Sequence, residues 1–183
     1  RRYAVSLCSA MLLFFAIVSI SFAQDPDSTG CKPDSFFPDS GNCGYDVEHY
    51  DIEFSWSEES NFLDAKVRLK ITALQDADNI PLDFTDKYRI EEITVDDFIS
   101  NFTQTDNDLI IDYPVTKGQR YQVQVIYSGL AEEQSIFGSS PALKGSSPGP
   151  FCIVSEPTLA ADWFPCNNSL NDQATFTTTI TVP

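Results

Sequence analysis

Histidine is almost absent from this sequence: His49 is the only one among 183 residues. A catalytic zinc site usually takes three protein ligands that include two or three histidines, so residues 1–183 do not supply one. The motifs HExxH, CxxC and GxxxxGK[ST] are missing too, which removes common signatures of metallopeptidases, zinc clusters and P-loop enzymes. His49 lies in an alternating stretch, as expected for a packing or surface residue. We therefore expect no catalysis, and no bound cofactor, from this chain alone.

Basic residues are also few, because 11 Lys and Arg stand against 27 Asp and Glu, a formal net charge of -16. Such a surface repels the phosphates of nucleic acids and of anionic membranes, so neither is an expected partner. Adjacent acids such as Glu58–Glu59, Glu91–Glu92 and Glu132–Glu133 point to opposite faces of an extended strand. They are typical of solvated surface rather than of paired catalytic carboxylates.

Helical periodicity is missing after residue 23, whereas strict alternation of apolar and polar residues recurs. In "YDVEHYDIEFSW" the apolar side chains Tyr50, Ile52, Phe54 and Trp56 fall on one face, which predicts a strand with one buried side. The same pattern occurs in "AKVRLKITAL", "NIPLDF", "YRIEEITV", "DLIIDY", "RYQVQVIYSG" and "ATFTTTITV", with turn residues between. The sequence predicts an all-β fold, an antiparallel sandwich or saddle-shaped sheet.

The first residues have the features of a secretory signal peptide. Arg1 and Arg2 precede an apolar core from Leu7 to Ile20, and the small residues Ser21 and Ala23 suit cleavage before Gln24. A membrane anchor over residues 3–23 is the alternative, because that run is long enough to span. Cleavage would leave 9 basic and 27 acidic residues, a formal net charge of -18. We expect a secreted, extracellular or periplasmic protein that does not associate with membrane after cleavage.

Four cysteines remain after the predicted cleavage: Cys31, Cys43, Cys152 and Cys166. An even number in an oxidising compartment suggests disulfides, and four cysteines allow three pairings. The simplest is local, Cys31 with Cys43 and Cys152 with Cys166. The alternative for Cys166 is a free thiol buried in the core.

The stretch "SEPTLAADWFPCNNSLNDQATF", residues 155–176, concentrates aromatic, proline and cysteine residues. Together with "TTTITVP" after it and "YDVEHYDIEFSW" before it, this stretch resembles the N-terminal domain of the aminopeptidase N family of zinc metallopeptidases. The resemblance covers about Tyr45 to Pro183. Its version of the motif looks most like that of exported bacterial members, although "NNSLND" replaces the more frequent Asp-x-Pro sequence after the cysteine.

The resemblance implies a β-saddle domain that caps a separate catalytic domain, which carries the zinc and the HExxH and GxMEN motifs. In the family the N-terminal domain lends one Gln or Glu to the active site, ten positions before the motif cysteine. That position is Glu156 here, which a surface role would also suit. A fixed carboxylate in a cleft can bind the α-ammonium group of a peptide by a charge-assisted hydrogen bond. Glu156 is therefore the expected substrate-binding residue.

The aromatic motif has a structural role in either interpretation. Trp163, Phe164, Pro165 and Cys166 are expected to dock one layer on another and so to fix the direction of Glu156. Asn168, Asn171 and Asp172 suit the tight turn that follows.

The expected organisation is a signal peptide (1–23), an extended leader (24–44) and a β-domain (45–183) that is incomplete at its C-terminal end. The expected function is that of a non-catalytic N-terminal fragment of a secreted zinc metalloaminopeptidase. Its partners would be its own catalytic domain and peptides with a free N-terminus. The alternatives are a non-catalytic extracellular β-sandwich used for adhesion or binding, and an inactive family member that only binds peptides.

Overall fold

The computed structural model describes residues 35, 37–38, 40–57, 59–130, 143–144, 152–153, 155 and 158–181. Regular structure in this part of the chain is almost entirely β-strand, with one short 3-10 helix, η1 (Ala160–Asp162). The strands are β1 (Tyr45–Ser57), β2 (Phe62–Ala73), β3 (Ile80–Asp83), β4 (Arg89–Val95), β5 (Phe98–Ile99), β6 (Phe102–Thr105), β7 (Asp108–Ile111), β8 (Arg120–Leu130), β9 (Leu143–Lys144), β10 (Cys152–Ile153) and β11 (Thr175–Thr181). The predicted all-β class is confirmed.

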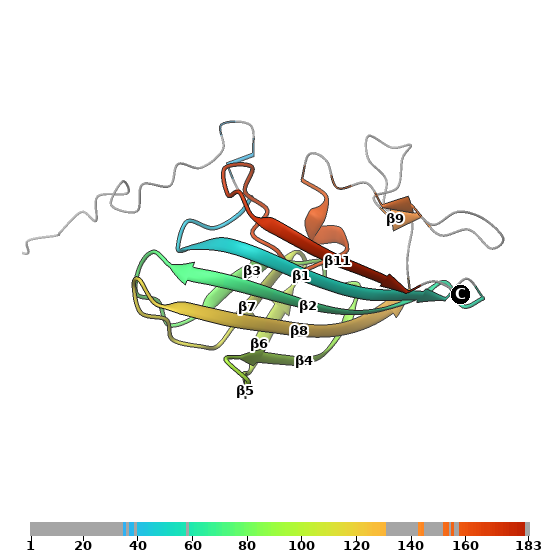
Figure 1. Ribbon diagram of the computed structural model, residues 1–183, viewed down its shortest axis with the longest axis horizontal. Coiled ribbons are helices and arrows are strands. Elements are labelled where there is room, and N and C mark those ends of the chain that lie inside the picture. The colour runs from blue at the N-terminus through green and yellow to red at the C-terminus, as the bar shows by residue number, and fades with distance from the viewer. Residues whose placement is uncertain are drawn as a thin grey trace, which may run out of the picture.

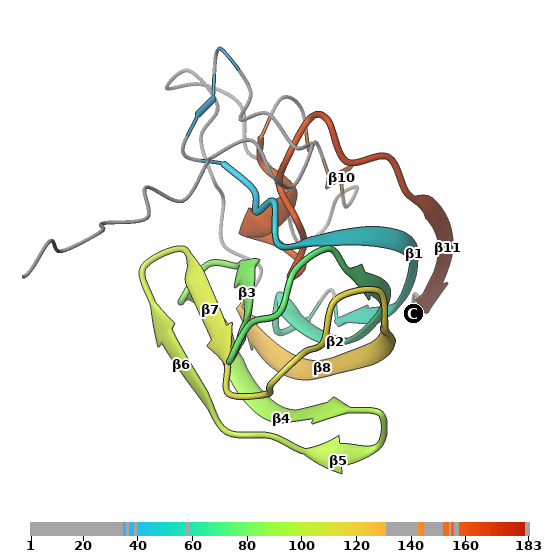
Figure 2. The same cartoon turned by 90° about the vertical axis from the view of Figure 1, so that its left-hand side faces the viewer.

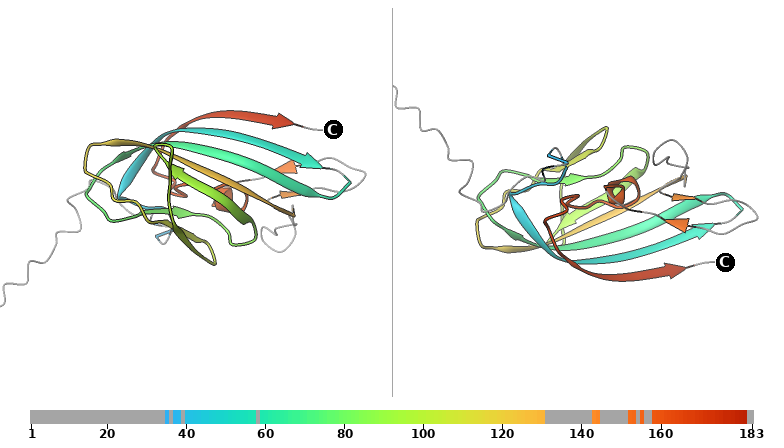
Figure 3. Two further views of the ribbon diagram at one scale, coloured as in Figure 1. Left: turned by 90° about the horizontal axis from the view of Figure 1, so that it is seen from below. Right: turned by 90° about the horizontal axis from the view of Figure 1, so that it is seen from above.

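The strands form one large sheet and two small ones. The large sheet has six strands in the order β11-β1-β2-β8-β4-β5, and its long strands run side by side (Figure 1). A three-stranded sheet has the order β3-β7-β6, and β10 pairs with β9. The long strands β1, β2 and β8 curve along their length (Figure 3). This curvature agrees with the predicted saddle shape.

Pairing is antiparallel between all described neighbours except one. Strand β11 runs parallel to β1, with His49 opposite Thr175 and Ser55 opposite Thr181. Antiparallel sheets were predicted from the sequence, so this parallel pair is a difference from that prediction. A parallel neighbour needs a long crossover connection, and here the chain passes through every other strand before β11 returns to β1.

Alternation along β1 and β2 divides the large sheet into a buried face and a polar face. Ile52, Val67 and Leu69 are at most 2% exposed and form part of the hydrophobic core. On the polar face, the Arg68 guanidinium lies 2.9 Å from the Asp51 carboxylate and 2.7 Å from that of Glu53. The predicted period of two therefore holds in both central strands.

The three-stranded sheet lies beside the buried face of the large sheet, as Figure 2 shows. Leu109 and Ile111 of β7 are fully buried and belong to the same core as the apolar residues of β8. Phe84, just after β3, packs edge-on against Tyr127 with ring centroids 4.8 Å apart. Burial of these side chains supplies the main stabilising free energy of the fold.

Strand β11 is an edge strand whose seven residues are all exposed. Phe176 and Ile180 lie on the same face as the core residues of β1 but are 57% and 55% exposed. His49 of β1 holds this strand through Thr175, whose Oγ1 lies 2.7 Å from Nδ1. The single histidine is thus a cross-strand hydrogen-bonding residue.

Two expected segments lie wholly or largely outside the described residues. They are the predicted signal peptide, 1–23, and the larger part of the leader, 24–44. No helix in the described part of the chain is long and apolar enough to cross a membrane.

Candidate functional site

The aromatic motif lies against the buried face of the large sheet, at the end of a turn that contains η1. Trp163 is 9% exposed, Phe164 4% and Cys166 2%. Trp163 packs edge-on against Phe54 of β1 at 5.9 Å and against Phe164 at 4.5 Å between ring centroids. Phe164 packs edge-on against Tyr50 at 5.5 Å. The aromatic side chains of the motif therefore pack against β1.

Hydrogen bonds from the motif reach the segment in which the expected substrate-binding residue lies. Glu156 itself is outside the described residues, but Ser155 and Thr158 on either side are described. The Trp163 indole N–H donates to the Ser155 hydroxyl at 2.8 Å, and the Leu159 N–H donates to the Ser155 carbonyl at 2.9 Å. Trp163 thus fixes the residue immediately before Glu156.

The motif is also tied to the strands beneath it. Asp83, at the end of β3, and Cys166 exchange two backbone hydrogen bonds of 2.8 and 3.0 Å. The Tyr127 hydroxyl of β8 donates to the Trp163 carbonyl, and the Thr85 N–H donates to the Ala161 carbonyl at 3.0 Å. Asp83 and Tyr127 were not identified from the sequence, because nothing local marks a residue whose partner lies 36 or more positions away.

Cys166 is free and buried, so the simplest predicted pairing, Cys152 with Cys166, is wrong. The alternative that the sequence left open, a buried core thiol, is what the structure contains. Burial raises the pKa of this thiol well above its usual value, and the neighbouring Asp83 carboxylate adds to the effect. A thiol that stays protonated is a poor nucleophile. Cys43 is disulfide-bonded, while Cys31 and the side chain of Cys152 lie outside the described residues.

Asn167 directly follows the motif, is 8% exposed and makes four hydrogen bonds. Its Oδ1 accepts the Asn42 N–H at 2.7 Å, and its Nδ2 donates to the Asn42 carbonyl at 3.0 Å and to Asp172 Oδ2 at 2.7 Å. Its own N–H donates to the Tyr50 hydroxyl at 3.0 Å. A turn role was predicted from the sequence for neighbouring residues but not for Asn167, since the contact with Asn42 spans 125 residues.

Two carboxyl groups beside the motif are partly buried. Desolvation raises the pKa of Asp83 above its usual value, although the N–H groups of Asn168 and Gly41 donate to it. Desolvation likewise raises the pKa of Asp172, against hydrogen bonds from Asn167 and Val47. The motif is therefore surrounded by acidic groups that ionise less readily than exposed ones.

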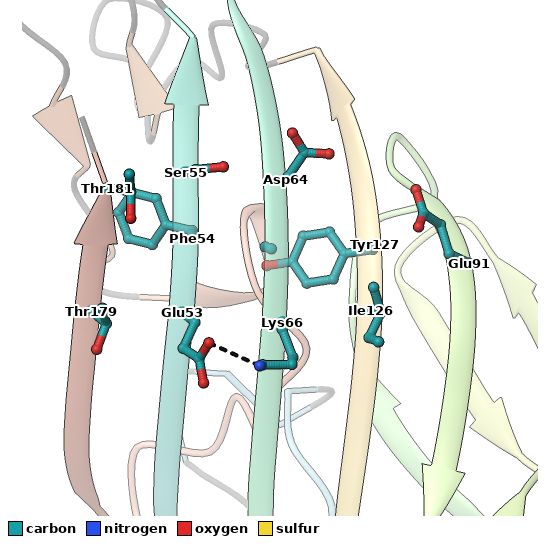
Figure 4. A pocket seen from close by; sticks show the side chains of 11 residues that line it. Glu53, Phe54, Ser55, Asp64, Lys66, Glu91, Ile126, Tyr127, Thr179 and Thr181 are labelled. Carbon is teal, nitrogen blue, oxygen red and sulfur yellow. Dashed lines mark ion pairs between the residues drawn. The ribbon is translucent and has the colours of Figure 1, made fainter. Parts of the chain in front are cut away.

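Two surface hollows accompany these residues. One of about 170 Å³ lies beside the motif and includes Tyr50, Ser155, Phe164 and Phe176. The other, of about 330 Å³, lies over the large sheet between Thr179 of β11 and Glu91 of β4, and the Lys66–Glu53 ion pair of 2.8 Å crosses it (Figure 4). No group of three His, Cys, Asp or Glu that could hold a metal occurs among the described residues.

Comparison with known families matches residues 46–183 to the model of the peptidase M1 N-terminal domain. No match to this chain was found among curated proteins. The matched residues include both the aromatic motif and β11.

Solved structures with a similar fold include an M1 zinc metallopeptidase from Deinococcus radiodurans, with 27% identity and a TM-score of 0.71 over 80% of this chain and 34% of that one. A two-domain M1 zinc metallopeptidase bound to L-arginine matches with the same identity, TM-score and coverage. The yeast LTA4 hydrolase in complex with bestatin shares the fold at 20% identity, with a TM-score of 0.63 over 76% of this chain and 23% of that one. The chain thus spans about a third or less of the length of these relatives.

Proposed function

Because this chain belongs to the peptidase M1 N-terminal domain family, we propose that it is the amino-terminal β-domain of an exported zinc-dependent aminopeptidase. In this role it covers part of the active site and helps to bind the free N-terminus of a peptide. Relatives of known structure are zinc metallopeptidases, and this chain matches only a third of their length. No metal-holding group of His, Cys, Asp or Glu occurs among the described residues, and the proposal assigns the metal and the peptide-bond chemistry to a separate catalytic domain of the parent.

The observation that carries the proposal is the hydrogen bond from Trp163 to Ser155. It connects a buried aromatic anchor directly to the residue before Glu156. An exopeptidase must recognise an α-ammonium group, and a carboxylate held in a fixed place does so without losing side-chain entropy on binding. The interaction strengthens when a facing domain excludes water, because the local dielectric falls.

Replacement of Glu156 by alanine in the full-length protein tests this role. We expect kcat/KM for peptides with a free amine to fall about 10- to 100-fold, as for loss of a hydrogen bond to a charged group. Steady-state kinetics would measure this, and competition by N-acetylated peptides should be unaffected. The matched control is Glu59→Ala, which removes an exposed acid from the turn between β1 and β2. An unchanged KM for free-amine peptides in Glu156→Ala would exclude the amine-anchoring role.

Sequence and activity of the parent protein test the wider proposal. It requires an HExxH motif with a downstream glutamate in the same polypeptide and loss of peptidase activity on treatment with a zinc chelator. A parent without that motif would instead support the non-catalytic extracellular binding module.

A further inference from the structure

Two Asn-x-Ser/Thr sequences, the acceptor motif for N-linked glycosylation, occur in this chain. One begins at Asn101 (NFT) and the other at Asn167 (NNS). Neither has proline at its middle position, which the motif excludes. The motif by itself does not distinguish the two asparagines, but their surroundings in the fold differ.

Asn101 lies at the surface between two edge strands. Strand β5 is the outermost strand of the large sheet and β6 is that of the three-stranded sheet, and the chain between them runs along the outside of the molecule (Figure 2). Asn101, Phe102 and Thr103 are all exposed. The Asn101 carbonyl accepts the Asp112 N–H at 2.9 Å, which holds its backbone in place. Among the described residues, none pairs with the side-chain amide of Asn101, so its Nδ2 is accessible.

Asn167 offers no such access, because its side chain is buried. Its Nδ2 uses both hydrogens, one toward the Asn42 carbonyl and one toward Asp172 Oδ2. A glycosylated amide nitrogen keeps a single hydrogen, so a sugar at this position would break one of the two bonds and leave a buried acceptor without its donor. It would also need space that the packed side chain does not have. A chain glycosylated at Asn167 could not keep this structure.

Large apolar side chains that are not buried surround Asn101 in the sequence. Phe98 is 69% exposed and Ile99 77%, and both belong to β5, just before Asn101. Phe102, directly after it, is exposed as well. Groups of exposed apolar side chains mark surfaces that another molecule or group covers. Sugar rings carry C–H groups on one face that pack on aromatic rings, and an N-linked glycan is a bulky, solubilising group. A glycan on Asn101 would therefore shield this apolar edge.

We propose that Asn101 is an acceptor site for an N-linked glycan and that Asn167 is not. The inference rests on export, which is part of the proposed function, and on no other part of it. The donor is an oligosaccharide carried on a lipid pyrophosphate, and an oligosaccharyltransferase of the exporting cell performs the transfer. Asn101 Nδ2 forms a bond to the anomeric carbon of the first sugar, while the bond from that carbon to the pyrophosphate oxygen breaks and the lipid pyrophosphate leaves. One amide proton passes to a base of the transferase.

Secretion of the protein from a cell that glycosylates exported proteins tests this proposal. A signal peptide of the host cell ensures entry into its secretory pathway, so the result does not depend on residues 1–23. Enzymatic release of the glycans in heavy-oxygen water converts each glycosylated asparagine to a labelled aspartate, which mass spectrometry of the peptides locates. We expect label at Asn101 in most secreted molecules and at Asn167 in none.

Thr103→Ala removes the acceptor motif but leaves Asn101 in place. It should abolish the label and raise the electrophoretic mobility to that of the enzymatically deglycosylated protein. The matched control is Thr103→Ser, which keeps the motif and should keep both the label and the lower mobility. A dye that fluoresces on exposed apolar surface should bind the alanine variant more strongly than the serine variant.

The unmodified chain decides the main point without any variant. An unlabelled Asn101 in the secreted, folded protein would overturn the proposal, and so would label at Asn167. Equal dye binding by the two Thr103 variants would exclude the shielding of Phe98 and Ile99 by the glycan. None of these readouts involves peptidase activity, so they stand whatever the result for Glu156.

Discussion

Replacement of Asn167 by aspartate lowers the free energy of unfolding by about 3 to 5 kcal/mol at neutral pH, the range for an uncompensated buried charge. The change adds one negative charge and removes two N–H donors at nearly constant volume. The present Nδ2 donates to the Asn42 carbonyl and to the Asp172 carboxylate. A carboxylate in its place would face both acceptors without a proton to share.

Urea denaturation followed by circular dichroism at several pH values measures this loss. The new group has a raised pKa in the folded state because of burial and the neighbouring Asp172, so the deficit should shrink as the pH falls through that value. The matched control is Asn171→Asp, which adds the same charge to an exposed position of the same loop and should change stability by about 0.5 kcal/mol or less. Equal losses of unfolding free energy for the two variants would show that the hydrogen bonds of the Asn167 amide do not account for the destabilisation.

Truncation of Trp163 to alanine costs about 3 to 5 kcal/mol, as expected for loss of a large buried aromatic side chain. The indole packs against Phe54 and Phe164, and the alanine would leave a cavity between η1 and the large sheet. Denaturation by urea with circular dichroism is the suitable measurement, because the substitution itself changes tryptophan fluorescence.

Trp163→Phe separates the two contributions of this residue. Phenylalanine keeps most of the apolar contact but cannot donate to Ser155, so we expect a loss of about 1 kcal/mol for the hydrogen bond together with a modest packing cost. Hydrogen exchange of residues around Ser155 should nevertheless rise in this variant. Stability that matches the alanine variant, or unchanged exchange at Ser155, would contradict the role of the indole N–H as the link to the segment of Glu156.

The strands and their buried faces were predictable because period-two alternation is a local property of the backbone. Tyr50, Ile52, Phe54 and Trp56 are buried as the pattern indicated, since successive side chains of a strand must point to opposite faces. The tail strand shows the limit of this reasoning. Its alternation gave the correct strand, but Phe176 and Ile180 stay exposed because β11 is an edge strand, and no local pattern distinguishes an edge from a centre.

The candidate site was predictable in part. The aromatic motif was identified from its composition and from the family resemblance, and its rings pack against Tyr50 and Phe54 of β1. The bond between Cys152 and Cys166 was a wrong prediction, because sequence spacing does not show which cysteine is enclosed by the core. Asn167, Asp83 and Asp172 were not recognised as a cluster, since their hydrogen-bond donors Asn42, Gly41 and Val47 are far away along the chain.

The sequence alone determined that this protein is built of strands, that it is strongly acidic and that a motif of the M1 peptidase N-terminal type anchors its last third. Periodicity, charge and motif spacing are carried by neighbouring residues, so they need no knowledge of the fold. Only the tertiary structure decided that β11 returns parallel to β1, that Cys166 is an enclosed thiol, and that Asp83 and Asn167 accept hydrogen bonds from Gly41 and Asn42. Those features depend on contacts between distant segments and on exclusion of water, which exist only once the sheets have packed.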